Sequence, residues 1–95
     1  MNIAIIKSYP IAINALRNYW IAYDPIGVMD DPEWPRDEYD NYLTDTLSLL
    51  QQTASKDDIL IYLKNASEHM GIEFEIGPAT KLVDEIMVWY RRYSE

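Results

Sequence analysis

The spacing of large apolar side chains predicts helices along most of the chain after Lys7. Steps of three and four residues separate these positions, which places the side chains on one face of an α-helix. The first run predicts a helix over about residues 10–23, with Pro10 in its first turn and an apolar face of Ala12, Leu16, Tyr19, Trp20 and Tyr23. Asp24-Pro25-Ile26-Gly27 predicts a turn after it, because proline disfavours a helical preceding residue and glycine accepts a positive φ.

The second run predicts a helix over about residues 35–52. The segment before it is irregular because it holds two prolines, and the second of them, Pro35, suits a first helical turn. At about 100° per residue, one face of this helix carries Tyr39, Tyr42, Leu43, Thr46, Leu47 and Leu50. The acidic residues of the run fall on the opposite face, which is therefore expected to meet solvent.

Two further helices are predicted over about residues 56–70 and 78–93. Ser55 and Asp58 have the spacing of a capping box before the third helix, and Gly71 is the expected left-handed residue after it. The third helix has an apolar stripe of Ile59, Tyr62, Leu63, Ala66 and Met70. The fourth follows Gly77-Pro78 and carries Leu82, Val83, Ile86, Trp89, Tyr90 and Tyr93.

Four amphipathic helices with short connections predict a single all-α domain over residues 1–95, arranged as a compact bundle or array. Ile3, Ile5 and Ile6 leave three alternatives open: they extend the first helix, pack as a coil, or form a short strand with residues 72–76. An isolated strand of this length is marginal, so residues 72–76 are interpreted as an extended connector.

Composition narrows the class of protein. The chain has 95 residues, of which 48% are hydrophobic and 25% charged, as is typical of one globular domain. It has no cysteine, which excludes disulfides and thiolate chemistry and fits a reducing compartment. The N-terminus has no basic leader, and no apolar run approaches the roughly 18 residues of a membrane span. We expect an unprocessed, cytoplasmic protein that does not bind membranes.

Acidic residues are concentrated between the first two predicted helices. The chain holds 16 acidic and 8 basic residues, a net charge of −8, which disfavours nucleic acid as a ligand. Residues 24–45 contain eight of the acids and only Arg36 as a base, so this acidic window has a net charge of −7. The helix dipole accounts for acids in a first turn, but not for those ahead of Pro35. We interpret the window as a partner-binding surface formed by Asp30, Asp31, Glu33, Trp34, Asp37, Glu38, Asp40 and Asp45.

Trp34 differs from the other aromatic residues in lying inside the acidic connection, between Glu33 and Pro35. Its ring either caps the helices or stands out as a binding anchor of the kind that interfaces favour. Base-stacking platforms pair aromatic rings with Lys and Arg, whereas the charges here are negative. The other rings lie on apolar helical faces and are expected in the core, namely Tyr19, Trp20, Tyr39, Tyr62, Trp89 and Tyr90.

No catalytic, metal or cofactor site is predicted. The carboxylates lack the alternating ligands and central glycine of a calcium-binding loop, and carboxylates on a solvated face have no reason to change their pKa. His69 is the single histidine, which excludes a catalytic triad and a His-rich metal site. Its position near the end of the third helix suits a contact with the helix dipole.

Two segments stand out together, Asp24-Pro25-Ile26-Gly27-Val28 and Asp37-Glu38-Tyr39-Asp40-Asn41-Tyr42. With Ala54-Ser55, Ile59, Tyr62-Leu63 and His69-Met70-Gly71, they resemble a family of small uncharacterised bacterial and phage-related helical proteins. The resemblance covers about residues 16–72, and Trp34-Pro35 departs from the more usual polar residues there. It implies an all-α fold and supplies no site. It is also compatible with an immunity role, since small acidic helical proteins are common among antidotes to bacterial toxins.

These observations favour a protein that binds a basic protein partner, as an immunity protein would bind and neutralise a nuclease-type toxin. A second hypothesis is a structural or regulatory bundle that forms a homodimer through Trp89, Tyr90 and Tyr93. A third is an enzyme that depends on His69. The first hypothesis requires the carboxylates between the first two helices to form one surface that the chain's own cations do not neutralise.

Overall fold

The computed structural model describes the backbone of residues 3–94 and the side chains of residues 9–94. Its elements are α1 (Ile3–Tyr23), the 3₁₀ helix η1 (Asp40–Tyr42), α2 (Leu43–Gln51), α3 (Lys56–Met70) and α4 (Ile76–Tyr93). The described residues contain no strand, so the predicted all-α fold with four α-helices is confirmed. No helix among these residues has the length and apolar character needed to cross a membrane.

The third predicted helix is confirmed at both ends. The Ser55 hydroxyl oxygen accepts a hydrogen bond from the Asp58 amide at 3.1 Å, which satisfies one of the free backbone donors of the first turn. Gly71 ends the helix in the left-handed conformation, with φ of 74°. Residues 72–75 form an irregular connector, as predicted, and α4 begins at Ile76, two residues earlier than expected.

The first helix begins earlier than predicted. It starts at Ile3, so Pro10 lies inside α1 and not in its first turn. A proline removes one backbone hydrogen bond and crowds the preceding turn, but the apolar residues on either side are compatible with helix. Of the three alternatives for the N-terminal isoleucines, the backbone adopts the extended first helix. The packing of the Ile3, Ile5 and Ile6 side chains lies outside the described part of the chain.

The predicted start of the second helix, at about residue 35, is wrong. Pro35 opens no helix, because residues 36–39 form turns, and α2 begins only at Leu43 after the short η1 helix. The chain turns here because Tyr39 and Arg36 make hydrogen bonds back to the preceding loop. The predicted apolar face is nevertheless buried at Tyr39, Leu43, Thr46, Leu47 and Leu50, and half-buried at Tyr42.

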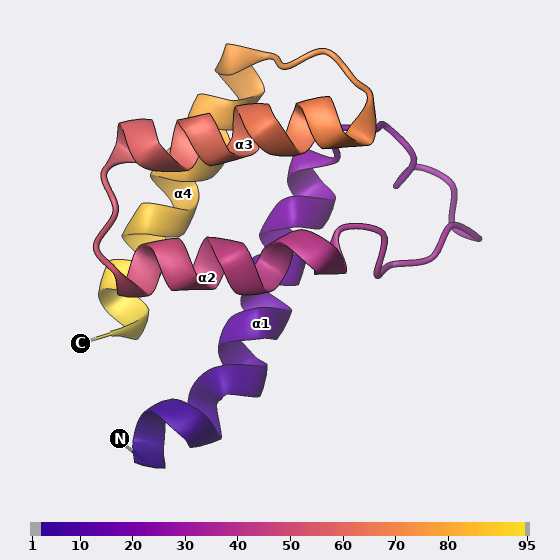
Figure 1. Cartoon of the computed structure of the whole chain (residues 1–95). Helices are drawn as coiled ribbons and strands as arrows, with labels where there is room; N and C mark the ends of the chain where they lie inside the picture. Colours follow the sequence, from indigo (N-terminus) through magenta and orange to yellow (C-terminus); the bar gives the residue numbers. More distant parts are fainter. Residues whose placement is uncertain (1–2, 95) are drawn as a thin grey trace.

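The core forms where α1 packs against α4 and α2, while α3 packs against α4. Figure 1 shows α2 and α3 crossing in front of α1 and α4. Trp20 of α1 lies at the centre with 0% exposure, and its ring stacks on Tyr42 at 5.4 Å between centroids. Its indole N–H donates to the Thr46 hydroxyl at 3.2 Å. The predicted burial of the aromatic residues is confirmed for Trp20 and Tyr39, while Tyr19, Tyr62, Trp89 and Tyr90 are half-buried against the core.

Candidate interaction surface

The acidic segment of the sequence forms a loop between α1 and η1, and Figure 1 shows this loop projecting from one side of the helical body. Asp24 organises its base. One oxygen of its carboxylate accepts hydrogen bonds from the amides of Gly27 and Val28, and the other accepts one from Met29 at 3.1 Å. Gly27 supports the turn with a φ of 79°, as predicted.

Tyr39 closes the loop across its base. Its hydroxyl donates to the Asp24 carboxylate at 2.7 Å and accepts a hydrogen bond from the Ile26 amide at 3.1 Å. Burial, followed by the hydrogen bond to Asp24, raises the pKa of Tyr39. Burial opposes ionisation of Asp24, but its hydrogen bonds from Tyr39 and three amides outweigh this effect and lower the pKa of the carboxyl. Asp24 is therefore an ionised structural group, and its charge is directed into the loop.

Arg36, the one base of the acidic window, holds the loop through hydrogen bonds to its backbone. Its guanidinium donates to the backbone oxygens of Met29 at 3.0 Å and Asp31 at 3.1 Å. The side chain of Asp31 in turn accepts the Glu33 amide at 2.9 Å. Because Arg36 contacts carbonyl groups and forms no ion pair with the described carboxylates, it shapes the loop without pairing with its acidic side chains.

Four predicted partner-binding carboxylates are exposed on this loop, and they belong to Asp30, Asp31, Glu33 and Asp37. Within residues 9–94, none of the four forms an ion pair with a Lys or Arg. Trp34 lies among them with 38% of its surface exposed, and its indole N–H donates to the Glu38 carboxylate at 3.1 Å. Of the two alternatives for Trp34, its position is therefore closer to an exposed ring than to a cap on the core.

The remaining two predicted residues have partners elsewhere in the chain. Asp40 accepts two hydrogen bonds from the Arg17 guanidinium of α1, at 2.9 and 3.0 Å. The hydrogen bond to Asp40 is the main cause that raises the pKa of Arg17, and the charge of Asp37 adds to it. Asp45 accepts a hydrogen bond from the Tyr62 hydroxyl of α3 at 3.0 Å. The structure therefore places six of the eight predicted residues on the loop and gives Asp40 and Asp45 hydrogen bonds to residues of other helices.

His69 lies at the exposed end of α3, where its ring meets the edge of Tyr42 at 6.3 Å between centroids. Among the described residues, no group of three or more His, Asp or Glu side chains is arranged to hold a metal ion.

The structural roles of Asp24, Tyr39 and Arg17 were not predicted from the sequence. A local signal exists for Asp24, since an Asp before Pro with Gly three residues later is typical of a turn in which the side chain accepts backbone amides. No local signal exists for the other two, because their partners lie 15 and 23 residues away in the sequence. Such pairs depend on how the helices pack.

The fold and the loop define a small all-α protein with an acidic, braced surface loop. Comparison of the chain with protein-family models, curated proteins and solved structures gives no match. The resemblance of residues 16–72 to a family of small helical proteins therefore stays a prediction.

Proposed function

We propose that this chain is a protein-binding inhibitor of the immunity type, which covers the basic active site of a nuclease-type toxin with its acidic loop. The observation that carries the proposal is the group of four exposed carboxylates of Asp30, Asp31, Glu33 and Asp37, which lack ion-pair partners among the described residues. Carboxylates can take the place of substrate phosphates, because both accept charge-assisted hydrogen bonds from Lys and Arg.

The bracing of the loop supports the proposal energetically. Ordering the backbone of a flexible loop at an interface costs free energy, so a loop whose backbone is already held in shape binds with a smaller penalty. Asp24 and Arg36 hold this loop through hydrogen bonds to its backbone, and Tyr39 donates a hydrogen bond to Asp24. A concentrated negative charge also attracts a basic partner over distances of about 10 Å and raises the rate of association.

The experiment begins with a partner captured on the immobilised protein at low salt and released at high salt, and then measures association kinetics with that partner. We expect the single reversals Asp30→Lys, Glu33→Lys and Asp37→Lys each to slow association about threefold or more at low salt, with a smaller effect at high salt. Glu68→Lys, an exposed position on α3, changes the net charge equally and is the control. If loop and control variants bind alike, the proposal is wrong.

A second candidate is a structural or regulatory protein that forms a homodimer through its aromatic helix. The exposed Val88 of α4, at 47% exposure beside Trp89, favours this candidate. The Trp89 ring already stacks on Tyr93 at 5.3 Å and lies beside Tyr19 at 6.1 Å, both measured between ring centroids. Part of its apolar surface is therefore covered within the chain. Sedimentation of the protein separates the two candidates, since the homodimer predicts a concentration-dependent mass that the Val88→Lys variant lowers.

A further inference from the structure

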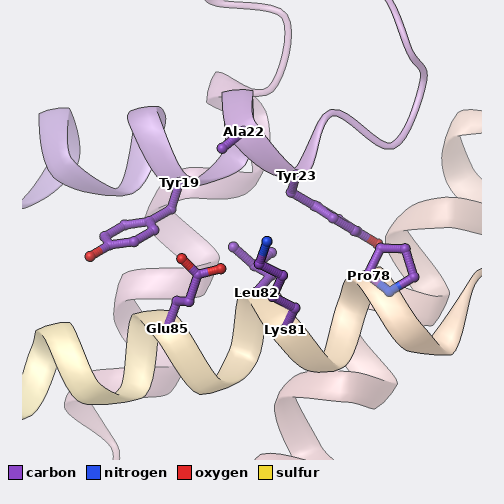
Figure 2. A pocket seen from close by; sticks show the side chains of 7 residues that line it. All are labelled: Tyr19, Ala22, Tyr23, Pro78, Lys81, Leu82 and Glu85. Carbon is purple, nitrogen blue, oxygen red and sulfur yellow. The ribbon is translucent and has the colours of Figure 1, made fainter.

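Three neighbouring hollows follow the seam between α1 and α4. The first, of about 260 Å³, lies at the root of the acidic loop and is lined by Asp24 and Pro25. It shares Tyr23 and Pro78 with the middle hollow, of about 440 Å³, which Figure 2 shows from close by. The middle hollow shares Tyr19 and Glu85 with the third, of about 450 Å³, which reaches Arg92. We call these three hollows the seam groove.

The length of the seam groove fits a peptide better than one small molecule. At a rise of about 1.5 Å per residue, the stretch of α4 from Pro78 to Arg92 is about 20 Å long. About six residues of extended chain, at roughly 3.3 Å each, or about four turns of helix cover this distance. A bound segment of that size has room for several side chains in successive hollows.

The middle and far hollows offer apolar contacts. In Figure 2, Tyr19 and Tyr23 descend from α1 on either side of the hollow, and Leu82 rises toward them from α4. The far hollow continues this surface with Val88 and Trp89. Aromatic and aliphatic walls of this kind bind large apolar side chains, and helix-in-groove recognition uses such anchors at successive turns.

The charge of the seam groove is unequal along its length. The hollow at the loop end is lined by Asp24, Glu73 and Glu75, and none of the described Lys and Arg residues lines it. Farther along, cations accompany the acids, since Lys81 and Glu85 both line the middle hollow and Arg92 lines the far one. Asp84 of the far hollow pairs with Lys56 at 2.7 Å. One end of the groove is therefore acidic, and the rest is apolar with nearly balanced charge.

We propose that the seam groove binds a segment of the partner protein that has cationic residues at one end and large apolar side chains beyond them. The cationic end lies against Glu73 and Glu75, next to the acidic loop, and the apolar part occupies the middle and far hollows. This inference rests on the proposed function for the basic character of the partner, and it adds a second, apolar contact surface. Charge complementarity gives the segment its direction along the seam.

The probe is a synthetic peptide with a run of lysines followed by leucines at helical spacing, compared with a peptide of equal composition whose lysines are interspersed. Titration into the isotope-labelled full chain is followed by NMR. We expect the first peptide to bind about tenfold more tightly than the second, with shifts at Tyr19, Leu82, Trp89 and Glu73. Equal affinity of the two peptides, or shifts confined to residues 30–37, would overturn the proposal.

Two variants test the groove with matched controls. Ala22→Gln places a longer side chain into the middle hollow from an exposed helical position, and we expect it to weaken peptide binding about tenfold. Asn18→Gln, also exposed on α1 and one turn away, is the control. Glu73→Lys is expected to weaken binding about threefold at low salt, whereas Glu68→Lys leaves it unchanged. Equal binding by Ala22→Gln and Asn18→Gln would overturn the proposal.

The outcomes separate this inference from the proposed function. If Ala22→Gln blocks the peptide while the loop reversals leave partner association unchanged, the seam groove stands and the inhibitor proposal fails. If the loop reversals slow association while Ala22→Gln has no effect on the peptide, the inhibitor proposal stands and the inference about the seam groove fails. A concentration-dependent dimer whose interface shifts coincide with the seam groove overturns the inference, because a second copy of the chain then occupies it.

Discussion

Asp24 shows how one side chain determines the shape of the acidic loop. Its carboxylate accepts hydrogen bonds from three backbone amides and from the Tyr39 hydroxyl. An asparagine is almost the same size, but its amide group would present a donor where the carboxylate accepts. The charge and the acceptor geometry of Asp24 are therefore both needed at the base of the loop.

We expect Asp24→Asn to lower the free energy of unfolding by about 1–3 kcal/mol, because the Tyr39 hydroxyl and the half-buried amides of Val28 and Met29 lose a charged acceptor. Urea unfolding measures this loss, and hydrogen exchange at the amides of Gly27, Val28 and Met29 reports it locally. Asp30→Asn, at an exposed position, should change stability by less than about 0.5 kcal/mol. Similar losses in both variants would contradict the role of Asp24.

The direction of the pKa shift of Asp24 determines how its contribution to stability depends on pH. The pKa of Asp24 is lowered in the folded chain, so its stabilising effect is present above the unfolded value of about 4 and is lost as pH falls through the folded pKa. We therefore expect the stability difference between the native chain and Asp24→Asn to be full near pH 7 and to shrink below about pH 4. Unfolding by urea over a series of pH values checks this, and a constant difference would contradict it.

At the scale of single elements, the acidic loop between α1 and η1 is held by Arg36 as well as by Asp24. We expect Arg36→Ala to increase hydrogen exchange at the amides of Asp31 and Trp34, whose acceptors lie within the loop, while the free energy of unfolding falls by only about 0.5–1.5 kcal/mol. Lys64→Ala on the exposed face of α3 is the control. Equal loss of protection in α3 would show that Arg36 acts on the whole fold.

The ends of the elements differ in how well the sequence predicts them. The start of α3 at Ser55 and its end at Gly71 depend on contacts within a few residues, and both predictions are confirmed. The start of α2 depends on contacts across the loop, because Tyr39 reaches back to Asp24 and Arg36 to Met29. A periodic apolar pattern contains no information on such contacts, so the predicted helix start at Pro35 is wrong.

The same difference applies to the candidate surface. The concentration of acidic residues in residues 24–45 is plain in the sequence, but the local pattern does not show which of them have partners. Arg17 lies on another helix, and its pairing with Asp40 depends on the packing of α1 beside η1. Tyr62 likewise reaches Asp45 from α3. The charge of the surface is thus a sequence property, while its division into paired and unpaired groups is a property of the fold.

At the scale of the whole molecule, Trp20 connects the elements that form the core. Its ring contacts Tyr23 within α1, Tyr39 in the loop and Tyr42 in η1, and its N–H reaches Thr46 in α2. A residue that touches so many segments makes them unfold together.

We expect Trp20→Phe to lower the free energy of unfolding by about 2 kcal/mol, because it leaves a cavity and removes the hydrogen bond to Thr46. Circular dichroism during urea unfolding measures this change as one transition that involves all helices. Trp34→Phe makes the same chemical change at a ring with 38% exposure, and we expect a loss below about 0.5 kcal/mol. Equal losses at the two positions would contradict the central role of Trp20.

The closure of the acidic loop by Asp24 and Tyr39 separates the residues that shape the loop from those at its tip. Asp30, Glu33 and Asp37 have exposed side chains that can be exchanged without disturbing either the hydrogen bonds at the base or the core. Substitutions at this tip therefore leave the hydrogen bonds that shape the loop intact. Under the proposed function, homologues that bind different partners should differ most at these three positions and share Asp24 and Tyr39.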